Sequence, residues 1–190
     1  KMEALLTSIS TVALAEMGDK TQLLALFLAT RFSSKLSIVF GILLATLLNH
    51  ALSAWFGVEV AYWLPQDWIS WIVGLSFILV GLWLLIPDKD ESTDSKVLKY
   101  GAFGATLVLF FLAEIGDKTQ IATVLLGAHY GGVWMVLLGS TIGMMLANVP
   151  VVFAGRWIID KVNAKRTRQL ACLLFLIIGV VTMASPLLAK

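Results

Sequence analysis

The sequence is poor in charge, and it lacks several features that would assign it to a common class of soluble protein. Charged residues make up 14% of the chain, about half of the share usual in soluble domains. The net charge is only +2 and no basic cluster stands out, which argues against a nucleic-acid-binding surface. No stretch matches the nucleotide-binding pattern G-x-x-x-x-G-K-[ST]. The single cysteine, Cys172, excludes an intramolecular disulfide.

Long apolar runs fill most of the chain instead. Hydrophobic residues make up 59% of the sequence, and the mean hydropathy is +0.90. Six runs reach or exceed the roughly 17–25 residues that a helix needs to cross a bilayer. They cover approximately residues 4–30, 36–64, 68–86, 97–128, 133–159 and 170–188. The sequence therefore predicts an all-α integral membrane protein with six transmembrane helices.

The first apolar run also resembles a secretory signal peptide, because Ala13-Leu14-Ala15 looks like a cleavage site. The same local pattern recurs in mid-chain as FFLAEIGD at residues 110–117, where no signal peptide can lie. We therefore expect the first run to be a retained transmembrane helix.

An internal repeat organises the chain. The heptapeptide EMGDKTQ at residues 16–22 returns as EIGDKTQ at residues 114–120, an offset of 114 − 16 = 98. The same offset pairs Gly41 with Gly139 and Phe77 with Phe175. These matches predict a first three-helix repeat at residues 1–87, a polar linker at 88–96 and a second three-helix repeat at 97–190. Because a unit of three crossings begins and ends on opposite sides, the second copy is expected to be inverted, as in many secondary transporters.

The basic residues predict the orientation. The two short loops after the second and fourth predicted helices carry no lysine or arginine, and the far termini carry only Lys1 and Lys190. The positive-inside rule then places both termini outside and the central loop in the cytoplasm. The segments on the cytoplasmic side carry ten basic residues: Arg31, Lys35, Lys89, Lys96, Lys99, Arg156, Lys161, Lys165, Arg166 and Arg168.

The two heptapeptides place costly residues inside apolar runs. On insertion scales a central Asp or Lys costs roughly 2.5–3.5 kcal/mol, so charges at this depth indicate a functional site. On a continuous helix, Glu16, Asp19 and Gln22 would share one face, as would Glu114, Asp117 and Gln120. Lys20 and Lys118 lie four residues after the glutamates, which suggests pairing with them. The alternative to a functional site is that these acids and lysines only form ion pairs that hold neighbouring helices together.

The glycines of the heptapeptides, Gly18 and Gly116, weaken a helix beside the acids by roughly 1 kcal/mol relative to alanine. Local unwinding there is allowed at membrane depth only where the backbone faces protein or a wet cavity. Such unwinding would add backbone carbonyl oxygens to the site.

The ligand set of this site is all oxygen. Four carboxylates and two ammonium groups give a formal charge of −2, which balances one divalent cation or two protons. The amides of Gln22 and Gln120 and the hydroxyls of Thr21 and Thr119 add further oxygens. Such a set suits Mg²⁺, Mn²⁺ or Ca²⁺ and offers nothing soft for Zn²⁺ or Cu⁺. The ligand residues alone do not indicate which of these three hard cations the site binds.

The doubled E-x-G-D-K-T motif in the first and fourth of six predicted helices resembles the Gdt-type cation/proton antiporter family, also known as uncharacterised protein family sixteen. That family includes Golgi Ca²⁺/Mn²⁺ exchangers and bacterial Mne-type manganese exporters. The resemblance implies Mn²⁺ export coupled to proton entry across a bacterial inner membrane, with the transported ion in place of any cofactor. It also implies four metal ligands: Glu16, Asp19, Glu114 and Asp117.

Two further polar residues lie inside predicted helices at equivalent places, His50 and Asn148 (148 − 50 = 98). They are candidates for additional ligands, proton carriers or interhelical hydrogen bonds. Two other functions remain open, a divalent cation channel or uniporter and an exporter of small organic cations or amino acids. An intramembrane aspartyl protease is disfavoured because position 16 is Glu and the two motifs are alike. We therefore do not expect an enzyme.

Overall fold

The computed structural model describes residues 1–89 and 93–188, and every regular element in these ranges is helical. The predicted linker at 88–96 is therefore covered only in part, since residues 90–92 lie outside the described chain. The elements are α1 (Met2–Glu16), α2 (Lys20–Arg31), α3 (Lys35–Trp63), α4 (Gln66–Leu84), the 3₁₀ helix η1 (Ser95–Tyr100), α5 (Gly101–Glu114), α6 (Lys118–Tyr130), α7 (Val133–Ala154), α8 (Arg156–Lys161) and α9 (Ala164–Leu188).

Five helices in the described chain are long and apolar enough to cross a membrane: Lys35–Trp63, Gln66–Leu84, Ser95–Glu114, Val133–Ala154 and Ala164–Leu188. The apolar run at 4–30 is divided between α1 and α2, and neither piece has the required length. The run at 97–128 is also divided, between α5, which reaches the required length together with η1, and α6, which does not reach it. The chain is thus a multi-pass membrane protein in which two of the six predicted helices are broken.

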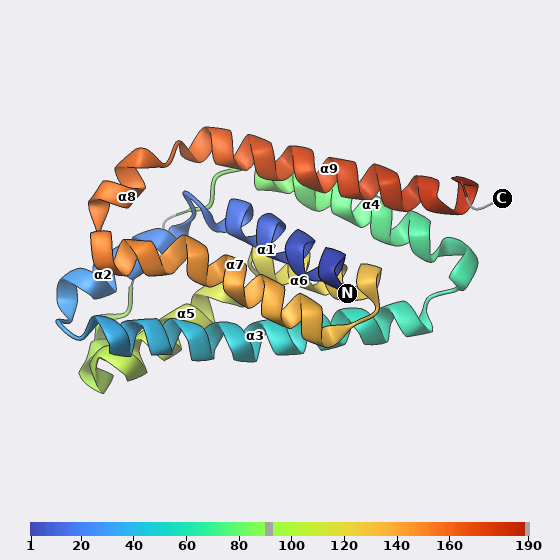
Figure 1. The fold of residues 1–190 in the computed structure, drawn as a ribbon. Helices are drawn as coiled ribbons and strands as arrows, with labels where there is room; N and C mark the ends of the chain where they lie inside the picture. The colour runs from blue at the N-terminus through green and yellow to red at the C-terminus, as the bar shows by residue number, and fades with distance from the viewer. Residues whose placement is uncertain (90–92, 189–190) are drawn as a thin grey trace.

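The helices lie along a common long axis (Figure 1). In that view α1 and α2 run in one direction, and α5 and α6 run in the opposite direction. The α2–α3 connection, η1 and α8 lie at one end of the bundle, whereas the α3–α4 and α6–α7 connections lie at the other. The most extensive helix contacts join α4 to α9, α1 to α7, and α3 to α6.

Small residues allow the backbones of contacting helices to approach closely. A Cβ added at Gly57 of α3 would lie 1.9 Å from the carbonyl oxygen of Val124 in α6, and one added at Gly127 of α6 would lie 2.5 Å from that of Ala54 in α3. Glycines of α7 come equally close to the backbone of α1, as Gly139 does to the carbonyl oxygen of Leu5. Close approach through small residues is the usual way in which membrane helices associate, because lipid offers no hydrophobic drive.

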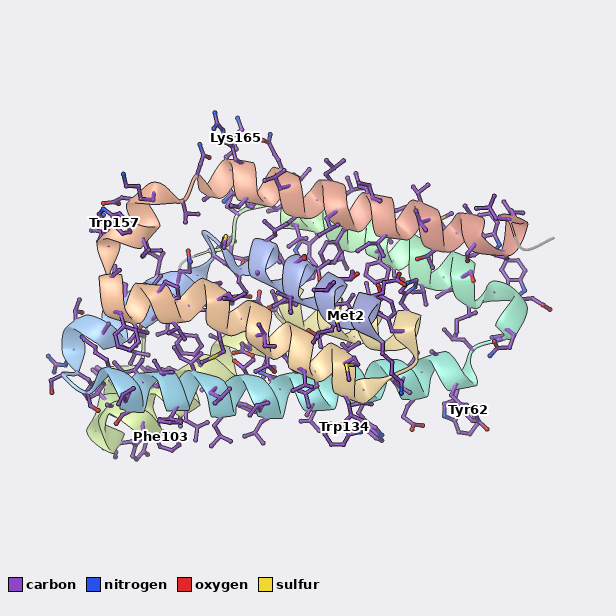
Figure 2. The ribbon with its side chains drawn as sticks, in the orientation of Figure 1. Met2, Tyr62, Phe103, Trp134, Trp157 and Lys165 are labelled. Carbon is purple, nitrogen blue, oxygen red and sulfur yellow. The ribbon has the colours of Figure 1, made fainter. Side chains whose placement is uncertain are left out.

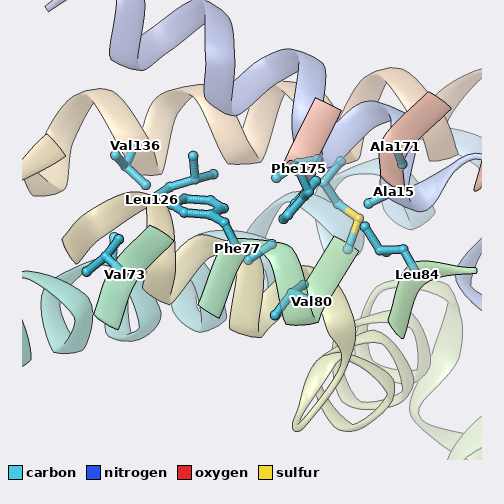
Figure 3. Packing of buried hydrophobic residues seen from close by; sticks show 13 residues of the cluster. Ala15, Val73, Phe77, Val80, Leu84, Leu126, Val136, Ala171 and Phe175 are labelled. Carbon is cyan, nitrogen blue, oxygen red and sulfur yellow. The ribbon is translucent and has the colours of Figure 1, made fainter. Parts of the chain in front are cut away.

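The buried core combines alanines with larger aromatic and branched side chains. Phe77 of α4 and Phe175 of α9 are fully buried, with their ring centroids 5.8 Å apart, and lie in the cluster drawn in Figure 3. Cys172 is also buried in α9.

The outer surface carries large apolar and aromatic side chains that point away from the bundle, among them Phe103 and Trp134 (Figure 2). An apolar surface of this extent is expected where lipid replaces water. Trp63 and Trp68, beside the short α3–α4 connection, are 79% and 64% exposed. These two tryptophans are therefore surface residues, as an interfacial belt requires, and not part of a packed core.

Candidate metal site

Both charged heptapeptides lie where a helix is interrupted. α1 ends at Glu16 and α2 begins at Lys20, while α5 ends at Glu114 and α6 begins at Lys118. Gly18 and Gly116 adopt φ values of +78° and +74°, a left-handed conformation that glycine alone enters readily. The expected unwinding is confirmed at both places. The expectation that each acid pair shares one continuous helical face is wrong, because three non-helical residues separate the two helical pieces.

The aspartates of the motifs cap the second piece of each broken helix. Asp19 Oδ1 accepts a hydrogen bond from the Lys20 N–H at 2.7 Å, and Asp117 Oδ1 accepts one from the Lys118 N–H at 2.8 Å. Capping of this kind satisfies a backbone donor that the helix itself leaves unpaired. The two caps fix the carboxylates beside the break.

The glutamines of the motifs fold back across the breaks. Gln22 Oε1 accepts from the Gly18 N–H at 2.8 Å, and Gln120 Oε1 accepts from the Gly116 N–H at 2.6 Å. Each amide thereby replaces a hydrogen bond that the break removes. A carbonyl oxygen has a second lone pair, so direct metal ligation by these two glutamines stays a prediction.

Three of the four motif carboxylates form a cluster. One ligand oxygen from each of Glu16, Asp19 and Asp117 lies within 4.8 Å of the others. Glu16 is fully buried; its Oε2 accepts a hydrogen bond from Thr21 Oγ1, and its Oε1 has no hydrogen-bond partner among the described residues. Asp117 Oδ2 accepts from Thr119 Oγ1 at 3.3 Å. Buried carboxylates so close together need a compensating charge, and a hard cation or protons would supply it.

Glu114 is not a member of this cluster, although the charges of Glu16 and Asp117 act on it. Its Oε1 accepts a hydrogen bond from Thr46 Oγ1 of α3 at 3.2 Å, and its Oε2 faces His50 Nε2 at 3.5 Å. The sequence repeat suggested that all four acids converge in the same way. The structure instead brings three together and turns the fourth toward α3.

Each broken helix contacts a helix from the other half of the sequence. Gln22 Nε2 donates to the Ala147 carbonyl of α7 at 2.7 Å, and Gln120 Nε2 donates to Asn49 Oδ1 of α3 at 2.8 Å. Positions 49 and 147 are equivalent in the repeat (147 − 49 = 98). Asn148, next to this contact, donates to the Met144 carbonyl at 3.0 Å, and its Oδ1 lacks a partner in the described chain.

The lysines of the motifs lie at one edge of the cluster. Lys118 Nζ forms an ion pair with Asp88 Oδ1 at 2.8 Å and also donates to the Ile86 carbonyl. The expected pairing of Lys118 with Glu114 is therefore wrong, because the break between them removes the helical i, i+4 spacing. The positive charge of Lys20 acts on both Asp88 and Asp117.

Asp88 is a residue of this site that sequence reasoning assigned only to the linker. Together with Asp19, Gly18 and Lys118 it lines a cavity of about 20 Å³, enough for one water molecule. Burial acts to raise the pKa of the Asp88 carboxyl, but hydrogen bonds with Asp19 and Lys118 outweigh it and hold that pKa below its usual value. The signal available in the sequence was its place directly after the third apolar run.

The Asp88–Lys118 ion pair gives a testable difference in stability. Its side chains are only 19% and 6% exposed, whereas those of the Asp160–Arg156 pair, 3.8 Å apart, are 67% and 80% exposed. We expect Asp88→Asn to lower the free energy of unfolding by about 2–3 kcal/mol, because it leaves the Lys118 ammonium buried without its carboxylate. Asp160→Asn should change it by less than about 0.5 kcal/mol. Denaturation of both purified variants in detergent checks this, and equal stabilities would show that the buried pair contributes nothing.

Comparison with known proteins identifies relatives of the whole chain. A sequence model of the family described as "Divalent cation/proton antiporter GDT1" matches residues 4–92 and 102–189. A Vibrio cholerae protein named "Putative manganese exporter" is 49% identical over 183 residues, which are 95% of this chain and 90% of that protein. A GDT1-like protein of Synechocystis is 26% identical over 205 residues, covering 95% of this chain and 97% of its own. No solved structure matches the chain.

Proposed function

Because this chain belongs to the GDT1 family of divalent cation/proton antiporters, we propose that it exports Mn²⁺ from a bacterial cytoplasm in exchange for protons. The observation that carries the proposal is the buried cluster of Glu16, Asp19 and Asp117, whose ligand oxygens lie within 4.8 Å of one another. Its oxygen ligands suit a hard divalent cation. The name of the Vibrio cholerae relative favours Mn²⁺, with Ca²⁺ as the second cation. The family is one of transporters, not enzymes.

The proposal includes six membrane crossings arranged as two inverted three-helix repeats. The broken pair α1–α2 is the sixth crossing, in addition to the five long helices. Two observations support the inverted arrangement: the offset of 98 residues between the breaks, and the opposite directions of α1–α2 and α5–α6 (Figure 1). The basic segments around η1 and α8 lie at one end of the bundle, which we assign to the cytoplasm of a bacterial inner membrane. Both termini then face outward.

Energetics require export to be coupled. Moving one elementary charge against 100 mV costs about 2.3 kcal/mol, so a divalent cation costs roughly 4–5 kcal/mol. Because metal ions bind deprotonated ligands, protons and the cation compete for the carboxylates of the cluster. Two protons that enter for each cation that leaves make the exchange electroneutral and driven by the pH gradient alone.

The test is cation flux in proteoliposomes that contain the purified protein. An imposed pH gradient should drive Mn²⁺ movement in the absence of a membrane potential, and the flux should fall when an ionophore collapses the gradient. Flux that ignores the pH gradient and follows the membrane potential would indicate a channel or uniporter. Transport of amino acids or organic cations without Mn²⁺ would indicate the third candidate function.

A further inference from the structure

The two halves of the sequence line the metal site with unequal polarity. One face of α3 carries polar side chains at the helical spacing i, i+3, i+4 and i+7, and all of them are buried: Thr46, Asn49, His50 and Ser53. The equivalent positions of α7, 98 residues later, are also buried but largely apolar: Met144, Ala147, Asn148 and Val151. Two equivalent half-sites for an ion would not need this difference. The α3 side therefore has a role that the α7 side lacks.

His50 is the most distinctive residue of this polar face. It is fully buried, and neither of its ring nitrogens has a hydrogen-bond partner in the part of the chain that the structure describes. The nearest carboxylate oxygen, Glu114 Oε2, lies 3.5 Å from His50 Nε2 and likewise has no hydrogen-bond partner there. Buried polar atoms are almost always paired, and a cation between these two facing atoms would satisfy both of them.

The geometry of this pair fits a metal ion. Thr46 holds Glu114 Oε1 at 3.2 Å, which leaves Oε2 directed at the imidazole. Two atoms that bind the same ion at about 2.1–2.3 Å lie about 3.0–4.6 Å apart, depending on the angle between them. The observed separation of 3.5 Å falls in this range. Glu114 is not one of the three clustered carboxylates, so the pair offers a further ligand position beside that cluster.

We propose that Glu114 and His50 form a second cation-binding position, with one nitrogen and one carboxylate ligand, that selects a divalent transition-metal ion over Ca²⁺ and Mg²⁺. This role of the pair rests on the proposed function of the chain as a divalent cation exporter. Ca²⁺ and Mg²⁺ take oxygen ligands, whereas imidazole is a common ligand of transition metals. The three-carboxylate cluster offers oxygen alone, which all of these cations accept, so the type of its ligands does not favour a transition metal. His50 is thus the residue that determines specificity.

The test compares His50→Asn with His129→Asn in proteoliposomes under the same pH gradient. His50→Asn gives α3 the residue that α7 has at position 148, and we expect it to lower the ratio of Mn²⁺ to Ca²⁺ transport rates at least tenfold. His129, the other histidine, lies against Phe77 and Thr182, so His129→Asn should leave the ratio unchanged. An unchanged ratio in His50→Asn overturns the proposal. A shifted pH profile with an unchanged ratio also overturns it, and would make His50 a proton carrier instead.

A spectroscopic measurement keeps the proposal testable even where the variant fails to fold. Electron spin echo spectra of Mn²⁺ bound to the wild-type protein should contain a ¹⁴N coupling from imidazole. That coupling should persist in His129→Asn and be absent from His50→Asn, or from His50→Gln, which retains a longer side chain. Bound Mn²⁺ without nitrogen coupling in the wild-type protein overturns this inference and leaves the proposed function intact. A wild-type protein that carries no Mn²⁺ overturns the proposed function itself.

Discussion

Asp117→Asn should abolish Mn²⁺ export while the protein still folds. Asn is as good a helix cap as Asp, so its side-chain oxygen can still accept the hydrogen bond that Asp117 takes from the Lys118 N–H at 2.8 Å. The substitution therefore removes one negative charge from the cluster with Glu16 and Asp19, together with the long hydrogen bond that Asp117 Oδ2 accepts from Thr119. Loss of a group that only orients a metal ligand typically lowers metal affinity about 10–100-fold, so we expect loss of a ligand charge to lower export at least about 100-fold.

The measurement is manganese resistance of cells that carry the variant, together with Mn²⁺ flux from purified protein. Asp67→Asn is the matched control, since Asp67 is an exposed acid in the first turn of α4, far along the chain from both motifs. It should behave like the wild-type protein. Normal manganese resistance in the Asp117→Asn cells would remove Asp117 from the set of ligands.

Gly18→Ala should destabilise the protein much more than Gly116→Ala, although the two glycines occupy equivalent positions. Both have φ near +75°, and an L residue held in the left-handed region costs about 1–2 kcal/mol in either place. A Cβ at Gly18 would also lie 2.6 Å from Ala164 Cβ and 2.8 Å from Ala164 Cα, so the start of α9 must move. Such overpacking adds about 1–3 kcal/mol.

Gly116 is the internal control, because a Cβ there would meet no atom of the described residues within 4 Å. We expect the free energy of unfolding to fall by about 2–5 kcal/mol for Gly18→Ala and by about 1–2 kcal/mol for Gly116→Ala. Denaturation of the two variants side by side in detergent gives the difference. An equal decrease in the free energy of unfolding of the two variants would mean that α9 does not pack tightly against the break between α1 and α2.

The sequence predicted the helical membrane fold and both breaks, because each rests on a local signal. Apolar runs of sufficient length predict helices, and a glycine followed by a capping aspartate predicts a place where a helix can stop and restart. The predicted shared face of Glu16, Asp19 and Gln22 failed for the same local reason. That prediction assumed a continuous helix from residue 16 to residue 22, whereas the glycine interrupts the helix between them.

The sequence could not predict that Glu114 is oriented differently from the other three motif acids. Glu16 and Glu114 stand in nearly identical heptapeptides, and only the contacts of Glu114 with Thr46 and His50 separate their roles. Those contacts join residues 68 and 64 positions apart (114 − 46 and 114 − 50), so no local pattern encodes them. Asp88 was missed for a similar reason, because its partner Lys118 lies 30 residues away (118 − 88).

The glycine contacts between helices determine which parts of the molecule can move as rigid bodies. Gly57 and Gly127 interlock the backbones of α3 and α6, and Gly139 interlocks α7 with α1. Each of these joints ties a helix of the first half to a helix of the second. A rocking motion of one half against the other would have to pull these backbones apart. Under the proposed transport function we therefore expect α1 to move with α7 and α3 with α6, so that the boundary between the two halves of the sequence does not mark the hinge.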